Sequence, residues 1–90
     1  MRNLDITKSV DRFLKGQPPK QFRQIVQTIL HLRINPEPHD SIQLVGHPEY
    51  RRVDIGEFRI IYRVEEDVVK IAVVGKRNDD SVYKKFKRLL

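Results

Sequence analysis

The chain contains no cysteine, which excludes two classes of small protein: a disulfide-stapled scaffold and a domain folded around thiolate-bound zinc. It also lacks any run of about eighteen apolar residues, and no signal-peptide core stands at the N-terminus. We therefore expect neither a membrane span nor secretion. Because the lack of cysteine suits a reducing compartment, the expected location is the cytoplasm.

Sequence motifs of several enzyme classes are missing too. There is no GxSxG nucleophile motif, no Walker loop for phosphates and no glycine-rich dinucleotide motif. The three histidines, His31, His39 and His47, lack the spacing of metal ligands, so no metal or other cofactor is expected. His47 enters the hairpin described below, either as a plain loop residue or close to the basic face of that hairpin.

What the chain has in excess is positive charge. Its 90 residues, 39% of them hydrophobic and 33% charged, suit one small domain spanning residues 1–90. Eighteen Lys and Arg against twelve Asp and Glu leave a formal net charge of +6. This charge favours an anionic partner, most commonly nucleic acid, and an acidic protein satisfies it equally well.

The N-terminal part of the chain is predicted to form one strand and two helices. Weak alternation predicts a short strand over residues 1–6. Thr7 or Ser9 caps a short helix that Gly16 closes, because a hydroxyl accepts from the free amides of a first turn. Apolar residues on one side predict a second helix over residues 20–34, and the prolines that follow end it in a loop.

Beyond Tyr50 the apolar residues recur at every second position, which predicts a β-hairpin that turns at Gly56-Glu57. The two-residue turn sets the register of the two strands. It pairs Ile55 with Phe58, Asp54 with Arg59, Val53 with Ile60 and Arg52 with Ile61. One face of the hairpin is therefore apolar, and the other carries Arg52, Asp54, Arg59 and Arg63.

A further strand and a terminal helix complete the predicted fold. The β-branched run over residues 68–74 is typical of a central strand covered on both faces. The chain then leaves the sheet, Asn78, Asp79 and Asp80 offer a helix cap, and residues 81–90 form a basic helix. The order β-α-α-β-β-β-α predicts an α+β fold: two N-terminal helices on one face of a small antiparallel sheet, with a basic C-terminal helix.

Three arginines are expected to converge: Arg52 and Arg59 from the hairpin face, and Arg77 from the end of the adjoining strand. Guanidinium groups bind phosphate oxygens in a bidentate manner and keep their charge at every accessible pH. The alternative, which spacing alone favours, is a solvated basic face with Arg59 tied to Asp54 across the strands. Tyr83, on the basic helix, is either an ordinary half-buried tyrosine or a group that stacks on a base or exchanges a proton.

Three segments carry a recognisable pattern: residues 44–48 (LVGHP), residues 50–64 (YRRVDIGEFRIIYRV), and residues 75–77 (GKR) with residues 81–83 (SVY). With these segments the sequence resembles the RelE/ParE toxins of bacterial toxin–antitoxin pairs, and the last segment resembles the RelE branch in particular. The resemblance implies an mRNA endonuclease that works in the ribosomal A site without a metal. The 2′-hydroxyl of the RNA attacks its own 3′ phosphate, leaving a 2′,3′-cyclic phosphate and a 5′-hydroxyl.

The resemblance also implies roles for individual residues. Arg59 and Arg77 match phosphate-clamping arginines, and Arg77 is also a candidate proton donor. Arg52 matches a basic residue on the second strand of the family. Tyr83 matches a tyrosine that stacks on or orients the nucleotide. Contacts to RNA and the ribosome are expected from Arg51, Arg63, Lys76, Lys84, Lys87 and Arg88.

Asp54 departs from the family pattern, in which the best-known members have a lysine at this position. Asp54 either neutralises Arg59 or serves as the general base, and Glu57 and Tyr83 are the other candidates for the base. The implied partners are the ribosome with its mRNA and a cognate antitoxin, which forms a hetero-oligomer, covers the basic face and is able to displace the terminal helix. Two alternatives stay open: a ParE-like inhibitor that binds DNA gyrase without cutting, and a non-toxic binding module.

Overall fold

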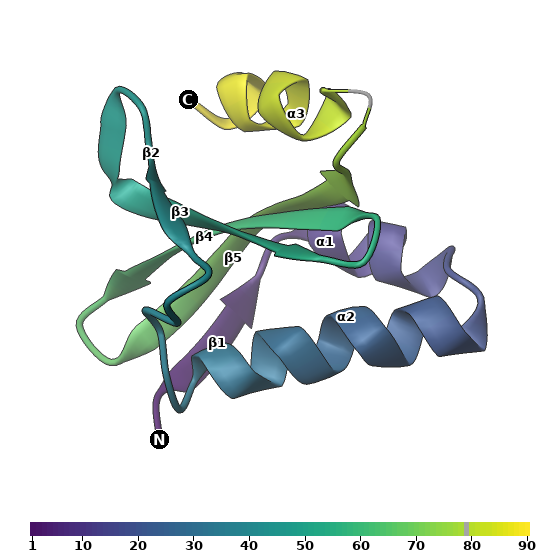
Figure 1. The fold of residues 1–90 in the computed structure, drawn as a ribbon, viewed down its shortest axis with the longest axis horizontal. Coiled ribbons are helices and arrows are strands. Elements are labelled where there is room, and N and C mark those ends of the chain that lie inside the picture. Colours follow the sequence, from purple (N-terminus) through teal and green to yellow (C-terminus); the bar gives the residue numbers. More distant parts are fainter. Residues whose placement is uncertain (79) are drawn as a thin grey trace.

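The computed structural model describes residues 1–78 and 80–90 and places helices on both sides of one sheet (Figure 1). In chain order the elements are β1 (Asn3–Ile6), α1 (Lys8–Lys15), α2 (Pro19–Leu32), β2 (Ile42–Leu44), β3 (His47–Ile55), β4 (Phe58–Glu65), β5 (Val68–Lys76) and α3 (Ser81–Leu89). Among these described residues, no helix is long and apolar enough to cross a membrane.

Within the described residues, five strands form the sheet in the order β1-β5-β4-β3-β2. Strands β2 to β5 are antiparallel neighbours, whereas β1 runs parallel to β5 with Leu4 opposite Val69. The predicted α+β class is confirmed, and the expectation of a wholly antiparallel sheet is corrected at this one edge. The reason is connectivity: after β1 the chain passes through α1 and α2 to β2 at the far edge of the sheet, so β1 pairs with β5, the last strand in the chain, and no short hairpin forces the two to be antiparallel.

Residues 42–55 contain a hairpin whose first half the sequence predicts as loop. β2 pairs with β3 through Ile42 and Arg52 and, beyond a bulge, through Leu44 and His47. Gly46 makes the turn at a φ of 81°, a left-handed conformation that favours glycine. A strand of three residues is too short to show alternation, so its pairing with β3 is what reveals it.

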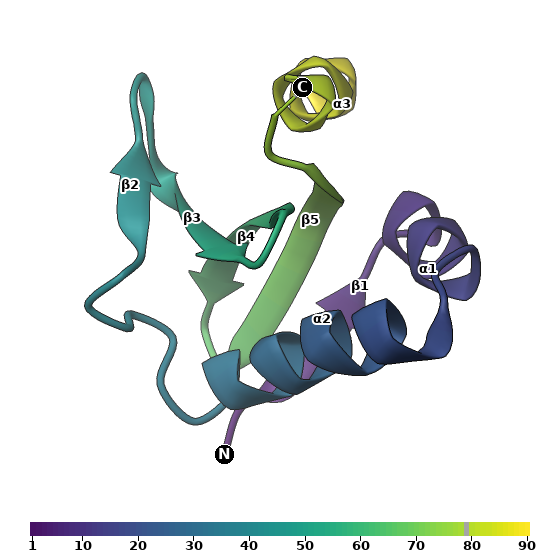
Figure 2. The same ribbon diagram turned by 45° about the vertical axis from the view of Figure 1, so that its right-hand side comes forward.

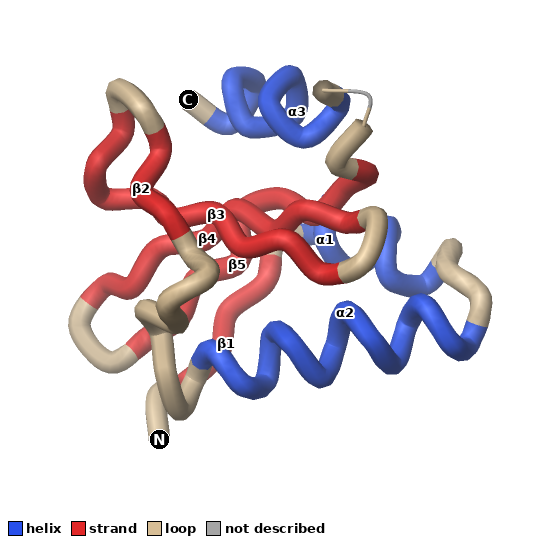
Figure 3. Tube along the Cα trace, in the orientation of Figure 1, coloured by secondary structure: helices blue, strands red, loops and turns tan. Residues whose placement is uncertain are grey.

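Each face of the sheet packs on its own apolar core. Helices α1 and α2 cover one face, where Ile25 of α2 and Ile60 of β4 belong to the same buried cluster (Figures 2 and 3). Helix α3 covers the opposite face, where Val82 and Phe86 pack in a cluster with Ile61 (Figure 1). Strand β5 contributes to both cores, which confirms the prediction of a strand buried on both sides.

The start of α1 is held by Thr7, one of the two predicted capping residues. Its Oγ1 accepts a hydrogen bond from the amide of Val10 at 3.2 Å and donates to the carbonyl of Ala72 at 3.1 Å. Ser9 lies inside α1, and Gly16 follows the helix as predicted. One hydroxyl therefore caps the helix and ties it to β5.

The position of α3 depends on residues just before and beneath it. Of the predicted cap residues, Asp79 lies outside the described residues, and Asp80 takes the N-cap position with a left-handed φ of 58°. The Asp80 carbonyl accepts from the amide of Tyr83 at 3.1 Å. Gly75 lets the helix approach β5 closely, since a Cβ there would lie 2.7 Å from Cγ2 of Val82. This approach brings Tyr83 over the sheet.

Candidate functional site

The β3–β4 hairpin has the predicted register. Asp54 pairs with Arg59, Val53 with Ile60 and Arg52 with Ile61 across the strands. The turn passes through Gly56 at a φ of 55°. Because side chains alternate along a strand, Arg52, Asp54 and Arg59 project from the face that α3 covers.

The hydroxyl of Tyr83 lies between two guanidinium groups. Its oxygen accepts a hydrogen bond from Nη1 of Arg52 at 2.6 Å and another from Nη1 of Arg59 at 3.1 Å. The guanidinium carbon of Arg59 is also 5.6 Å from the centre of the Tyr83 ring, within the range of a cation–π contact. Two strand residues and one helix residue thus form a single polar cluster, which we call the Arg52–Arg59–Tyr83 cluster.

Asp54 orients Arg59 within this cluster. Nε and Nη2 of Arg59 donate to the two carboxylate oxygens of Asp54 at 2.9 and 3.3 Å, and Arg52 lies 3.8 Å from the same carboxylate. The hydrogen bond from Arg59 lowers the pKa of Asp54 below its ordinary value, against the opposing effect of burial. The same bond raises the pKa of Arg59. Asp54 is therefore a carboxylate that is firmly ionised and weakly basic.

Arg77 lies at the turn end of the hairpin. Its backbone amide donates to the carbonyl of Glu57 at 2.9 Å, and its Nη1 donates to the carbonyl of Gly56 at 3.4 Å. The guanidinium is exposed and still contributes to lowering the pKa of Asp54. The three arginines thus share one electrostatic environment, with Arg77 outside the hydrogen-bonded cluster. The Glu57 side chain is exposed in the turn.

The remaining predicted RNA contacts separate into two groups. Four of them are exposed, three on α3 and one at the end of β5: Lys84, Lys87, Arg88 and Lys76. Arg63 lies farther along β4, where it pairs with Glu65 at 2.6 Å and approaches the Tyr50 ring at 5.7 Å. Of the exposed residues, Lys87 lines a pocket together with Arg52 and Tyr83, whereas Arg63 is paired farther along the sheet.

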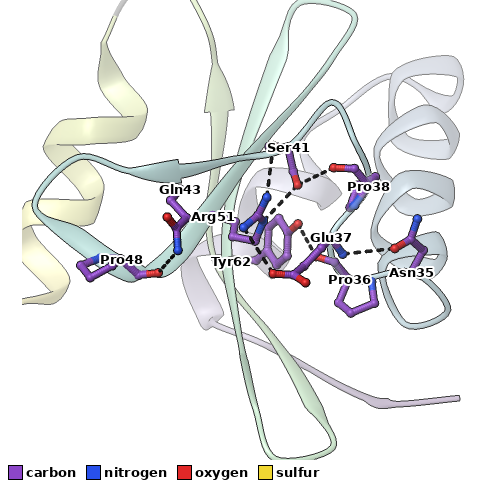
Figure 4. A network of polar contacts seen from close by, with 9 residues as sticks. All are labelled: Asn35, Pro36, Glu37, Pro38, Ser41, Gln43, Pro48, Arg51 and Tyr62. Carbon is purple, nitrogen blue, oxygen red and sulfur yellow. Dashed lines mark hydrogen bonds and ion pairs between the residues drawn. The ribbon is translucent and has the colours of Figure 1, made fainter.

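Arg51 does not join the cluster. It points to the opposite face of the sheet, where Nε and Nη2 donate to Oγ and the carbonyl of Ser41 at 3.0 and 3.2 Å (Figure 4). Nη1 lies 3.4 Å from the carboxylate of Glu37, and beside it the Tyr62 hydroxyl donates to the carbonyl of Pro36 at 2.6 Å. The strict alternation of β3 is the sequence signal that separates Arg51 from Arg52.

A groove of about 430 Å³ adjoins the cluster, between α3 and the β2–β3 hairpin. We call it the α3 groove. Its lining residues are Ile42, Gln43, Leu44, Val45, His47, Arg52, Tyr83, Phe86 and Lys87. The His47 ring stands edge-on to Phe86, with 5.1 Å between ring centres, so His47 does approach the basic face. The sequence contains no signal for this groove because most of its wall comes from the loop expected before β3.

The described residues contain no group of three or more His, Cys, Asp or Glu side chains placed to hold a metal ion. The chemistry that the site offers is instead cationic. Guanidinium groups held by neighbours, beside a groove that Lys87 also lines, are suited to bind a phosphate or another anion. The geometry thus describes a small basic protein with a site suited to an anionic partner.

Comparison with known proteins identifies the family. The chain matches the family model of the ParE toxin of type II toxin–antitoxin system, parDE, over residues 4–81. The putative toxin RelE1 of Methanocaldococcus jannaschii is 34% identical over 80 residues, which cover 83% of this chain and 89% of that relative. The chain therefore belongs to the RelE/ParE toxins of type II toxin–antitoxin systems, and its similarity is to the RelE type.

Solved structures agree with this assignment. A chain in the crystal structure of the archaeal RelE–RelB complex from Pyrococcus horikoshii OT3 superposes with a TM-score of 0.76 at 27% identity, covering 87% of this chain and 97% of that one. The isolated E. coli RelE toxin has the same fold, with a TM-score of 0.76 at 21% identity over 100% of both chains. The resemblance to the RelE/ParE family is confirmed.

Proposed function

We propose that this toxin is a ribosome-dependent endoribonuclease that cleaves mRNA in the A site, without a metal, and so inhibits translation. One observation carries the proposal: Nη1 of Arg52 and Nη1 of Arg59 converge on a single oxygen, that of Tyr83. Two guanidinium donors aimed at one oxygen are what a crowded, negatively charged phosphorane requires. A phosphate oxygen is able to replace the phenol between them.

In this proposal the RNA supplies its own nucleophile. The 2′-hydroxyl loses its proton to a base and attacks the neighbouring phosphorus, and the bond from phosphorus to the 5′ oxygen breaks. The products are a 2′,3′-cyclic phosphate and a 5′-hydroxyl, the latter after the leaving oxygen gains a proton. Arg52 and Arg59 stabilise the charge on phosphorus, Arg77 donates the proton, and Tyr83 orients the nucleotide.

Asp54 is assigned a positioning role in this scheme. Its lowered pKa makes it a poor base, and its two hydrogen bonds to Arg59 leave Nη1 of that arginine directed at Tyr83. Glu57 and Tyr83 are then the candidates for the base. The best-known members of the family have a lysine at this position, which adds a positive charge. Asp54 instead holds Arg59 in place.

We also propose that a cognate antitoxin controls the toxin in the cytoplasm, in a hetero-oligomer. The Pyrococcus horikoshii neighbour was crystallised as a RelE–RelB complex. The formal charge of +6 and the exposed lysines of α3 suit an acidic partner and equally the phosphates of the ribosome. Such a partner blocks cleavage by covering the arginines, and α3, with nine residues, is short enough to be displaced.

The proposal is tested with purified protein, ribosomes programmed with a defined mRNA, and mapping of new 5′ ends. We expect cuts confined to the A-site codon, with 5′-hydroxyl ends and none on free RNA. Arg59→Ala should lower the cleavage rate, and an Ile34→Ala variant, altered at an exposed side chain remote from the site, is the matched control. Unchanged cleavage by the Arg59 variant would contradict the assignment.

A second function has one observation in its favour, since the matching family model is described as a ParE toxin. A ParE-like toxin would inhibit DNA gyrase and cut no RNA. Supercoiling by purified gyrase in the presence of the protein distinguishes the two. Inhibition of supercoiling together with intact mRNA on the ribosome would replace the nuclease proposal.

A further inference from the structure

Helix α3 carries both Tyr83 and Phe86, which lie about one turn apart. Phe86 is 3% exposed and belongs to the apolar cluster between α3 and the sheet. Tyr83 packs against that cluster, and its hydroxyl accepts hydrogen bonds from Arg52 and Arg59. Because residues three apart are neighbours on a helix surface, the position of the Phe86 ring determines where the Tyr83 side chain lies. Whatever holds Phe86 therefore acts on the Arg52–Arg59–Tyr83 cluster.

Two rings of β3 contact Phe86. The ring centre of His47 lies 5.1 Å from that of Phe86, and the ring centre of Tyr50 lies 4.7 Å from it. The interplanar angles are 85° and 77°, so both pairs are edge-to-face. Aromatic pairs favour this arrangement, which depends on direction as well as on distance. The two contacts thus orient the Phe86 ring in addition to burying it.

His47 reaches Phe86 because β3 is irregular. In a regular strand, residues three apart point to opposite faces of the sheet, so His47 and Tyr50 would not contact the same ring. The pairing with β2, however, passes from Arg51 directly to His47 and skips residues 48–50 of β3. Such an irregularity re-aims a side chain. It turns the imidazole toward α3, which lies on the same side of the sheet as the β2–β3 hairpin (Figures 1 and 2).

The two rings of β3 differ in how they are held. Arg63 lies 5.7 Å from the centre of the Tyr50 ring and pairs with Glu65 at 2.6 Å, so Tyr50 is supported from a second residue. Among the described residues, the His47 side chain makes no hydrogen bond or ion pair, and its ring contact is with Phe86. Any effect of His47 on the site therefore passes through Phe86.

We propose that His47 is a positioning residue for the cleavage reaction, acting through Phe86 on Tyr83. The contact holds α3 where the Tyr83 hydroxyl lies between the two guanidinium groups of the cluster. The inference rests on the proposed function and goes beyond it, because it assigns a role to a residue that acts through another side chain. What this position requires is an aromatic ring, and phenylalanine should replace histidine there.

The direct test is fluorine NMR of protein labelled with 3-fluorotyrosine, which reports on the three tyrosines separately. The Tyr83 signal is identified by its loss in Tyr83→Phe. We expect His47→Ala to shift or broaden this signal, and His47→Phe, which keeps a ring, to restore it. The matched control is His39→Ala, which removes the same kind of side chain from an exposed loop position and should leave the Tyr83 signal unchanged.

Cleavage on programmed ribosomes measures the consequence for the reaction. His47→Ala should lower kcat about two- to tenfold with KM unchanged, since the loss of one aromatic pair corresponds to about this factor. His47→Phe should restore most of the rate, and His39→Ala should cleave as the wild type does. Circular dichroism checks that each variant is folded. If His47→Ala fails to fold, His47→Leu replaces it, because leucine fills space without a ring and should still disturb the Tyr83 signal.

The outcomes separate this inference from the proposed function. An unchanged Tyr83 signal in a folded His47→Ala or His47→Leu variant would overturn the inference, whatever the cleavage rate. Loss of cleavage in His47→Phe with a wild-type Tyr83 signal would also overturn it, and would assign chemistry to the imidazole itself. If the wild type cuts no mRNA while the Tyr83 signal still responds to His47, the nuclease proposal fails and the positioning of Tyr83 by His47 is supported.

Discussion

Replacing Asp54 by asparagine keeps the size of the side chain and removes its charge, which tests the centre of the site. The wild-type carboxylate accepts two hydrogen bonds from Arg59, at 2.9 and 3.3 Å. An amide retains one acceptor oxygen and turns a donor toward the guanidinium, so at least one bond is lost. Because 16% of the Arg59 side chain and 31% of the Asp54 side chain are exposed, solvent screens the pair partly. We expect Asp54→Asn to lower the free energy of unfolding by about 1–2 kcal/mol.

The pH dependence gives this loss a signature. The folded-state pKa of Asp54 lies below 3.8, its value in an unstructured chain, so the carboxylate stabilises the fold fully above that pH. The contribution disappears as the pH falls through the lower, folded-state pKa. Urea unfolding should therefore show a clear difference between wild type and Asp54→Asn near neutral pH, and a shrinking difference below pH 3.8. A difference that stays constant would refute the pairing argument.

Cleavage by the same variant separates positioning from base catalysis. A positioning role predicts a cleavage rate on programmed ribosomes reduced by less than about tenfold, whereas loss of a general base typically costs about 10²–10⁴-fold. Arg59→Ala provides the comparison, since it removes the group that Asp54 positions. A thousandfold loss in Asp54→Asn with unchanged stability would make Asp54 the base after all.

Three further changes test the architecture around the site. Gly75→Ala places a Cβ 2.7 Å from Cγ2 of Val82, so α3 must shift. We expect the free energy of unfolding to fall by about 1–3 kcal/mol, and an unchanged midpoint of urea unfolding would contradict the close packing. Arg51→Ala removes the two hydrogen bonds to Ser41 and should lower the free energy of unfolding by about 1–3 kcal/mol without weakening phosphate binding. Weaker phosphate binding by this variant would place Arg51 in the anion site. Tyr83→Phe removes a hydroxyl that is one of the two candidate bases. If Tyr83 is the base, the variant should cleave at least about tenfold more slowly while ribosome binding persists, and wild-type cleavage would exclude the hydroxyl from the reaction.

Much of the hairpin could be predicted from the sequence, because its determinants are local. Alternation from Val53 onward and a glycine with positive φ in a two-residue turn leave one register that buries the apolar side chains. That register by itself places Arg52, Asp54 and Arg59 on one face of the hairpin. The same alternation places Arg51 on the opposite face from Arg52. The family resemblance by itself does not distinguish the two.

The contacts between distant segments depend instead on the tertiary structure. Tyr83 lies 31 residues from Arg52 and 24 from Arg59, and the hydrogen bonds between them exist because α3 packs on β5 above Gly75. The parallel pairing of β1 with β5, the short strand β2 and the α3 groove likewise depend on how elements dock. Periodicity and turn residues report on local dihedral angles and on which side of an element is buried. They carry no information about which distant element covers that side, since packing across the whole molecule determines it.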